Sequence, residues 1–166
     1  MPIDRAHLHR KYGPYVYGVG REDLRNFVAA VAGGVPGHAF ASGAPEHAHP
    51  LTWDEDAARA GPHGGLVAPP GFAAAFAIEP FSQAVADPAL GLDLVRLLHG
   101  EQQLEWLAPV RPGDRLETTG EITRIDAKPG LDVVEVTTST VNQHGRVVVR
   151  GVWTAVIRSG DPSSSG

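Results

Sequence analysis

The second half of the chain is dominated by stretches in which apolar and polar residues alternate. This period of two is typical of antiparallel strands that bury one face. The turn sequences RPGD, DAKPG and NQHG separate the stretches and contain Gly113, Gly130 and Gly145. The pattern predicts four long strands, at residues 94–107, 115–125, 131–141 and 146–158.

The first half of the chain carries less regular patterns. Residues 14–20 alternate and predict a short strand, and the residues after them have helical spacing until Gly33 and Gly34 end the pattern. Residues 35–69 are irregular, with a short helix expected at 53–60. An irregular stretch of this length indicates either a functional loop or an element that the pattern does not reveal.

Residues 70–86 have a third pattern. From Phe72 to Ile78 every residue is apolar, which predicts a helix buried on all sides, and Pro80 is expected to kink or interrupt it. Such a helix needs cover all round, and a strongly curved antiparallel sheet wrapped around it, with a second subunit closing the rest, supplies that cover. The expected fold is therefore α+β, with the arrangement of the hotdog fold.

Composition narrows the class of protein. The 166 residues fit one domain, at 1–158, followed by a disordered tail at 159–166. The net charge of −5 favours neither nucleic acid nor an anionic membrane as partner. Without cysteine there is no disulfide or thiolate chemistry, and without a long apolar run no membrane span is expected. These features indicate a cytoplasmic protein.

The stretch EHAHPLTWD, at residues 46–54, concentrates ionisable side chains. On a strand, His47 and His49 would share one face, as the ligands of a metal do. Pro50 argues against a central strand there, and no histidine follows RPGD until His144, so the usual last ligand of a cupin-like metal site is missing. We therefore expect no metal and no other cofactor. A nucleophilic hydrolase is also disfavoured, since the chain has no cysteine and no G-x-S-x-G sequence.

Two longer segments resemble a known family. HPLTWDEDAARAGPHGGLVAPPGF and LHGEQQLEWLAPVRPGDRL look like segments of MaoC-like dehydratases, and the resemblance runs from about Tyr15 to Arg158. The branch it resembles includes the N-terminal dehydratase domain of fatty-acid synthases and the acyl-binding subunits of mycolic-acid dehydratases. The resemblance implies a hotdog fold, a homodimer or a heterodimer with a catalytic MaoC-like subunit, and a 2-enoyl or (R)-3-hydroxyacyl thioester of coenzyme A or acyl carrier protein as substrate.

Active members of that family carry a motif resembling G-D-x-N-P-L-H-x-D, whose Asp and His activate water. Aligned on Pro50 and Leu51, the motif places His47 at the Asp position, His49 at the Asn position and Thr52 at the His position. A threonine hydroxyl is far too weak an acid to act as a general base near neutral pH. The resemblance thus implies the acyl-binding half of an enzyme whose partner brings the catalytic pair.

Residues 68–76 supply the other candidate contacts. Pro70 and Gly71 begin the expected helix, where backbone N–H groups favour negative charge, and the corresponding turn in active relatives resembles an oxyanion hole. Phe72 and Phe76 lie four residues apart, beside alanines that leave room for an acyl chain or for close packing. Ordinary helix initiation and ordinary core packing explain the same residues equally well.

Three function classes stay open at this point. The first is a hydratase or dehydratase subunit, and the second is an acyl-binding or structural subunit without chemistry of its own. The third is a hotdog thioesterase, for which Glu79 is the candidate carboxylate. A partner that brings Asp and His would favour the first, and release of free thiol from acyl-CoA would favour the third.

Overall fold

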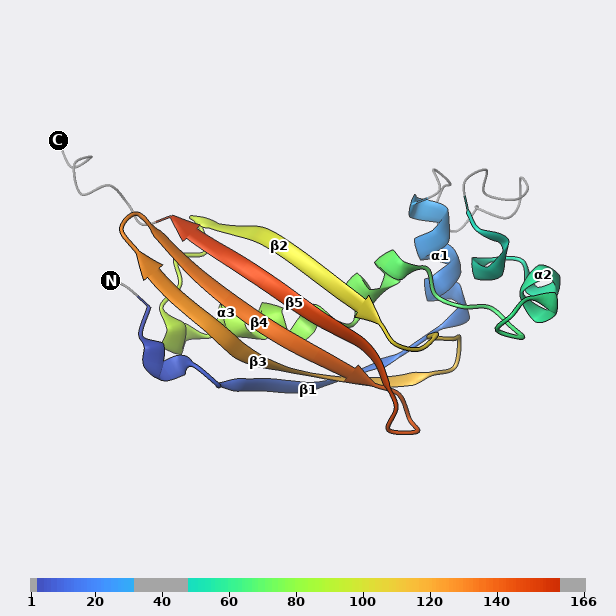
Figure 1. The fold of residues 1–166 in the computed structure, drawn as a ribbon. Helices are drawn as coiled ribbons and strands as arrows, with labels where there is room; N and C mark the ends of the chain where they lie inside the picture. The colour runs from blue at the N-terminus through green and yellow to red at the C-terminus, as the bar shows by residue number, and fades with distance from the viewer. Residues whose placement is uncertain (1–2, 32–47, 159–166) are drawn as a thin grey trace.

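The computed structural model describes residues 3–31 and 48–158. Its centre is one antiparallel sheet with the strand order β1-β3-β4-β5-β2 (Figure 1). The consecutive strands β3, β4 and β5 are neighbours, whereas β2 lies at the edge opposite β1 and pairs only with β5. The strands span Lys11–Gly18 (β1), Leu97–Trp106 (β2), Arg115–Lys128 (β3), Leu131–Val141 (β4) and Val147–Arg158 (β5).

The four strands predicted in the second half are confirmed, and β4 has the predicted bounds. The largest difference is at β2, which begins at Leu97 rather than at residue 94. Asp93 causes the delay, because its side chain accepts a hydrogen bond from the Val95 N–H and its carbonyl accepts one from the Arg96 N–H. The side chain thus offers the backbone a turn in place of the ladder.

Alternate residues of β4 face the interior of the fold. Along the strand, buried positions alternate with partly buried ones throughout. Three of the buried residues are polar, Asp132, Thr138 and Thr140. Both threonines are paired: Thr138 accepts a hydrogen bond from Trp153 Nε1 at 3.0 Å, and the Thr140 and Thr118 hydroxyls lie 2.8 Å apart. Pairing removes the cost of placing these hydroxyls in an apolar core.

Residues 70–86 do not form the single helix that the sequence predicts. Pro70–Ala75 is a 3₁₀ helix, η3, and the α-helix α3 spans Glu79–Ala86. Pro80 lies in the first turn of α3, where a missing N–H costs nothing, so the predicted interruption is confirmed. Burial on all sides is wrong for this segment, since Ala74 and Ala75 are exposed, while the residues facing the sheet are buried: Phe72, Ala73, Phe76 and Ala77.

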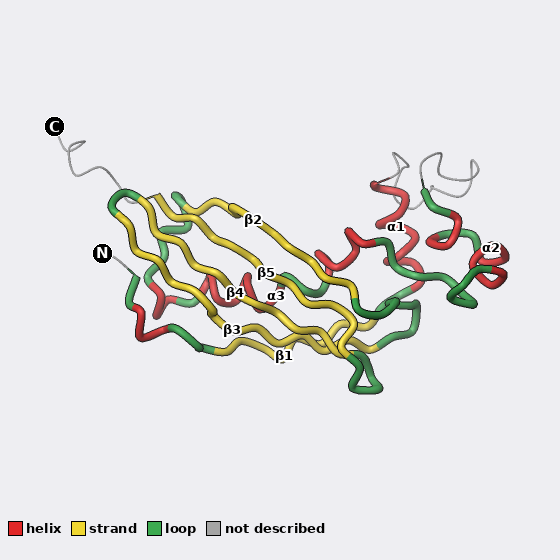
Figure 2. Tube along the Cα trace, in the orientation of Figure 1, coloured by secondary structure: helices red, strands yellow, loops and turns green. Residues whose placement is uncertain are grey.

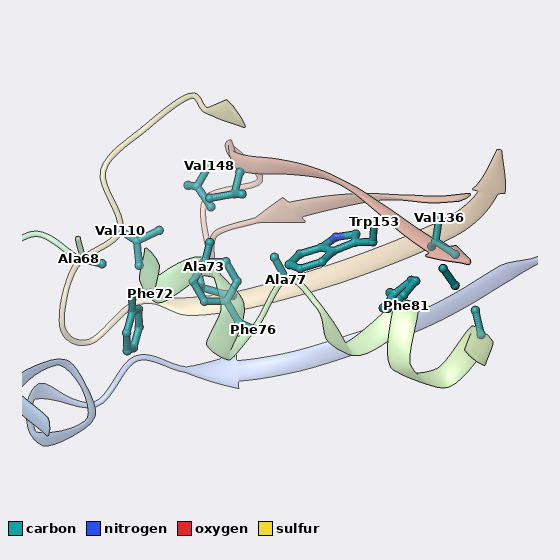
Figure 3. Close-up of a cluster of buried hydrophobic side chains, with 14 of the residues drawn as sticks. Ala68, Phe72, Ala73, Phe76, Ala77, Phe81, Val110, Val136, Val148 and Trp153 are labelled. Atoms are coloured by element: carbon teal, nitrogen blue, oxygen red, sulfur yellow. The ribbon is translucent and has the colours of Figure 1, made fainter. Parts of the chain in front are cut away.

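The core lies between α3 and the sheet. Figure 3 shows Ala77 and Phe81 beside Trp153, which is fully buried. The rings of Phe81 and Trp153 stack with centroids 6.2 Å apart. On the sheet side, a Cβ at Gly120 would lie 2.6 Å from Pro80 Cβ, so only glycine permits this approach of α3 to β3.

The remaining helices gather at one end of the molecule, beyond the ends of the strands (Figure 2). They are α1 at Arg21–Val31, the 3₁₀ turn η2 at Pro50–Thr52 and α2 at Glu55–Ala60. Two other 3₁₀ turns of the same length as η2, at Arg5–His7 and Pro88–Leu90, do not belong to this group. Both helices predicted in this part, at 21–32 and 53–60, are confirmed with small shifts. Within residues 3–31 and 48–158, none of the helices is long and apolar enough to cross a membrane.

Candidate functional site

An apolar cavity of about 370 Å³ lies where α1, η2 and the segment before η3 meet. Three of the residues singled out by the sequence line it: His49, Thr52 and Pro70. The structure therefore brings together two positions of the aligned motif, His49 and Thr52, and the first residue of η3. The other lining residues are mostly aliphatic: Val28, Val31, Ala48, Leu51, Val67, Ala68 and Pro69.

One wall of the cavity is the turn η2, which a short set of hydrogen bonds holds in place. Pro50 begins the turn, and His49 caps it by accepting a hydrogen bond from the Leu51 N–H at Nδ1, at 3.3 Å. The Thr52 N–H and hydroxyl both donate to the His49 carbonyl, at 2.9 and 2.7 Å. Thr52 is only 7% exposed, so its hydroxyl proton is used by the backbone rather than presented to a substrate.

The His49 imidazole has a defined arrangement in this turn. Because Nδ1 accepts a hydrogen bond, the neutral ring carries its proton on Nε2. The side chain is exposed and lines the cavity, so Nε2–H is available as a donor to a bound molecule. The sequence motif places an amide side chain at this position in active relatives, and a neutral imidazole can likewise donate one hydrogen bond.

The opposite wall is the extended segment 67–70. The Val67 N–H donates to the Leu51 carbonyl at 3.1 Å, and the Ala68 N–H donates to the Val110 carbonyl at 2.8 Å. These two bonds fix the segment between η2 and the loop that follows β2. The wall and the turn are thus hydrogen-bonded directly to each other.

Gly71 supplies the first backbone N–H group of η3. Pro69 and Pro70 have none, and the Phe72 N–H is already bonded to the Pro69 carbonyl at 2.9 Å. In the part of the chain that the structure describes, the Gly71 N–H has no acceptor. Gly71 is also exposed, and a Cβ there would lie 3.2 Å from Phe27 Cζ. A free, accessible amide therefore adjoins the cavity.

Phe72 and Phe76, the other predicted substrate contacts, lie in the hydrophobic core. They are 1% and 0% exposed, and the Phe72 ring packs edge-on against Phe27 with centroids 5.4 Å apart. Phe76 packs edge-on against Trp106 at 6.5 Å. The contact of either ring with an acyl chain stays a prediction.

The other acidic and basic candidates have different surroundings. Asp54, the last position of the aligned motif, caps α2 by accepting hydrogen bonds from the Asp56 and Ala57 N–H groups, each at 3.0 Å. Glu79 is the first residue of α3 and is partly exposed. His47 and the tail at 159–166 lie outside the described residues. Among those described, no three His, Asp or Glu side chains gather as metal ligands would.

The sequence patterns did not identify several of the residues that line the apolar cavity. Val28 and Val31 belong to an amphipathic helix, and nothing in the helical period says which apolar side chain borders a cavity rather than a core. Val67 belongs to a stretch without periodicity. These residues are recognised as cavity-lining only in the tertiary structure, where α1, residues 48–52 and residues 67–70 meet.

Comparison with known proteins places the chain among dehydratase-related sequences. The family described as "FAS1-like, dehydratase domain region" matches residues 6–150. A UPF0336 protein of Streptomyces avermitilis is 36% identical over 162 residues, covering 97% of this chain and 99% of that protein. A UPF0336 protein of Streptomyces griseus is 33% identical with the same coverage.

Solved structures resemble the whole fold. A MaoC-like dehydratase is 28% identical with a TM-score of 0.73, covering 94% of this chain and 43% of that one. The HadBC (3R)-hydroxyacyl-ACP dehydratase complex of Mycobacterium tuberculosis contains a chain that is 24% identical with a TM-score of 0.72, covering 94% and 99%. The ChsH1–ChsH2 complex of the same organism matches at 15% identity and a TM-score of 0.62, covering 91% and 98%. The predicted hotdog fold is confirmed.

Proposed function

Because the chain belongs to the FAS1-like dehydratase family and has the MaoC-like hotdog fold, we propose that it is the acyl-binding subunit of a hydratase or dehydratase acting on 2-enoyl or (R)-3-hydroxyacyl thioesters. The observation that carries the proposal is the shared cavity. The aligned motif at His49 and Thr52 and the turn at Pro70 are far apart in sequence and line one apolar space. An apolar space with a few polar groups suits an acyl thioester.

The same cavity explains why a partner is needed for the chemistry. Addition of water to a 2-enoyl thioester requires a base that removes a proton from water and a donor that stabilises the developing enolate oxygen. Among the lining residues, Thr52 is bonded to the backbone and His49 uses Nδ1 as a cap acceptor. No carboxylate is among the residues that line this cavity in the described chain. The base therefore comes from another subunit.

A hydrogen-bond donor, by contrast, is present in this chain. The free N–H of Gly71 adjoins the cavity and suits the thioester carbonyl, whose oxygen gains negative charge as water adds at the β-carbon. We assign Gly71 this role, with Pro70 setting the start of η3 and removing a competing donor.

The partner subunit would lie along β2. This strand is hydrogen-bonded to β5 on one side, and residues on and before it expose apolar side chains: Leu98 is 54% exposed, Leu94 57% and Val95 95%. Such an edge favours pairing with another strand. Two of the similar structures are complexes of two different subunits, HadBC and ChsH1–ChsH2, which supports a second hotdog subunit as the occupant.

The test is expression of the chain with and without a genomic neighbour that carries the D-x-N-P-L-H sequence. Hydration of crotonyl-CoA is measured as the loss of enoyl absorbance. We expect it only in the co-expressed sample, since each acid–base group accelerates such a reaction by roughly 10²–10⁴-fold. Hydration by the chain alone at enzymatic rates would contradict the division of labour. Binding without turnover in both samples would leave an acyl-binding subunit, and release of free thiol would identify a thioesterase.

A further inference from the structure

A second cavity, of about 260 Å³, is lined by three arginines. Arg21, Arg59 and Arg111 come from α1, α2 and the RPGD turn, respectively, and the remaining lining residues are Glu55, Gly64, Gly65, Leu66 and Pro112. We propose that this arginine cavity binds a phosphate group of the thioester carrier. The identity of the carrier rests on the proposed function, whereas the affinity for phosphate does not.

The charge in the arginine cavity is positive. Glu55 is the one acidic residue in the described lining, and it pairs with Arg21 and, at 3.7 Å, with Arg25. Arg59 pairs with the exposed Asp56 at 2.9 Å. In the described chain no carboxylate lies within ion-pair distance of the Arg111 guanidinium, so this cation is available to a bound anion.

The backbone holds Arg111 in a defined position. Its N–H donates to Asp114 Oδ2 at 2.8 Å, and its carbonyl accepts from the Asp114 N–H at 3.1 Å. The turn is bonded in addition to the residue that follows β1, through Gly113 N–H to the Val19 carbonyl at 2.8 Å. The fixed main chain keeps the Arg111 side chain at the cavity, and the planar fork of its guanidinium matches phosphate oxygens.

The facing wall of the arginine cavity is suited to close approach by an anion. Gly64 adopts a φ of +66°, and a Cβ added there would meet nothing within 4 Å, so the space beside it is open. The N–H groups of Gly65 and Leu66 have no acceptor among the described residues. Backbone amides and arginines together are the usual donors to phosphate.

The arginine cavity and the apolar cavity share two walls. Residues 50–60 contribute Leu51 and Thr52 to the apolar cavity and Glu55 and Arg59 to the arginine cavity. Residues 64–70 contribute in the same way, with Gly64–Leu66 on the arginine side and Val67–Pro70 on the apolar side. This arrangement suits a ligand with an apolar end and a phosphorylated end, as acyl-CoA and acyl-phosphopantetheine both have.

The volume of the arginine cavity limits what it holds. At about 260 Å³ it is smaller than the 300–1,000 Å³ or so of pockets that enclose whole small molecules. It therefore suits a phosphate and the atoms attached to it. Two sources carry such a group, the 3′-phosphate of coenzyme A and the phosphodiester of phosphopantetheine on a carrier protein.

The experiment is calorimetric titration of the purified full chain with four probes. Crotonyl-CoA, crotonyl-3′-dephospho-CoA and crotonylpantetheine carry decreasing phosphate, and 3′,5′-ADP carries phosphate without a thioester. Arg111→Gln is expected to weaken crotonyl-CoA and 3′,5′-ADP binding by about ten-fold or more and to leave crotonylpantetheine unaffected. Arg59→Gln, whose partner is the exposed Asp56, is the second variant if the first unfolds. Arg146→Gln, in the β4–β5 turn, is the control for loss of one positive charge.

The probes separate the possible outcomes. If loss of the 3′-phosphate alone removes the effect of Arg111→Gln, coenzyme A is the source, and if the effect persists, the phosphopantetheine arm is the source. Arg111-dependent binding of 3′,5′-ADP, combined with no hydration of crotonyl-CoA by the co-expressed sample, would support the phosphate site and reject the proposed hydratase function. Equal affinities for all probes in wild type and Arg111→Gln, or failure of wild type to favour phosphorylated probes, would overturn the site.

Discussion

The hydroxyl of Thr52 is bound to its own turn. Its 2.7 Å hydrogen bond to the His49 carbonyl and its burial give it the role of a structural residue at a position where the resemblance places a catalytic imidazole. If that role is right, removal of the hydroxyl loosens η2 and leaves the chemistry, which belongs to the partner, intact.

We therefore expect Thr52→Val to lower the free energy of unfolding by about 0.5–1.5 kcal/mol, the usual contribution of one hydrogen bond. Thr52→Ser keeps the hydroxyl and is the matched control. Urea titrations measure the stability, and crotonyl-CoA hydration by the co-expressed complex measures the activity. A loss of turnover in Thr52→Val without a loss of stability would show that the hydroxyl takes part in the reaction.

Tyr12 and Asp87 form a hydrogen-bonded pair whose ionisation makes the stability of the fold depend on pH. Burial is the main cause that raises the pKa of Tyr12 from 10.0 to about 12, and the 2.9 Å hydrogen bond to Asp87 is the second. Hydrogen bonds from the Ala89 N–H and then from Tyr12, together with Arg10 at 2.9 Å, lower the pKa of Asp87 below 3.8. The folded state thus favours neutral Tyr12 and ionised Asp87.

The sign of the pH dependence follows from these directions. A raised Tyr12 pKa gives stability that is fully present below pH 10 and is lost as the pH rises from 10 to about 12. A lowered Asp87 pKa gives stability that is present above pH 3.8 and is lost as the pH falls below it. Burial also raises the pKa of Tyr17, so Tyr12 supplies only part of the alkaline component. We expect Tyr12→Phe to reduce the alkaline component and Asp87→Asn to reduce the acidic one, in unfolding free energies measured across pH.

How far the sequence predicts single residues depends on the range of their contacts. The cap at Asp54 is a local arrangement, since an Asp before Glu-Asp and two alanines is a typical helix start. The placement of His49 and Thr52 beside Pro70 came from resemblance to a motif and not from periodicity. Arg21, Arg59 and Arg111 belong to no common motif, so only the tertiary structure brings them together.

At the scale of elements, the strands were predictable and the central segment was only partly so. The strands β3, β4 and β5 each bury one face, so buried residues occur at about every second position of their sequences. Residues 72–78 are all apolar, but for two different reasons. Phe72 and Phe76 face the core from a 3₁₀ turn, while Ala74 and Ala75 are small residues on the surface. Composition cannot separate these cases, which is why a single buried helix was predicted.

The contact of α3 with β3 gives a test at this scale. A Cβ at Gly120 would lie 2.6 Å from Pro80 Cβ and 3.3 Å from Val136 Cγ1, and both neighbours are buried. We expect Gly120→Ala to lower the free energy of unfolding by about 1–3 kcal/mol, as overpacking of a core does. Gly18→Ala is the matched control, because a Cβ at this exposed strand residue would meet nothing within 4 Å. Equal denaturation midpoints for the two variants would mean that α3 does not rest on β3 at Gly120.

At the scale of the whole molecule, the sheet has two edges of different character. At one edge β1 pairs with β3, and at the other β2 pairs with β5. Leu98 on β2 is 54% exposed, and Leu94 and Val95 just before it are also exposed. On β1, Val16 is 45% exposed, beside the partly buried Tyr15 and Tyr17. Exposed apolar residues concentrated at one edge favour association there.

We therefore expect Leu98→Asp to disrupt the pairing of this chain with a hotdog partner and to leave the fold intact. A charge at the centre of a buried contact should raise the dissociation constant by about ten-fold or more. Val16→Asp places the same charge on the opposite edge strand and should leave association unchanged. Size-exclusion chromatography with light scattering measures assembly, and circular dichroism checks that both variants fold.

Because the base for water addition would come from the partner, Leu98→Asp should also abolish crotonyl-CoA hydration in the co-expressed sample. Dissociation by Val16→Asp instead would place the partner along β1, and unchanged assembly in both variants would mean that neither edge carries the interface.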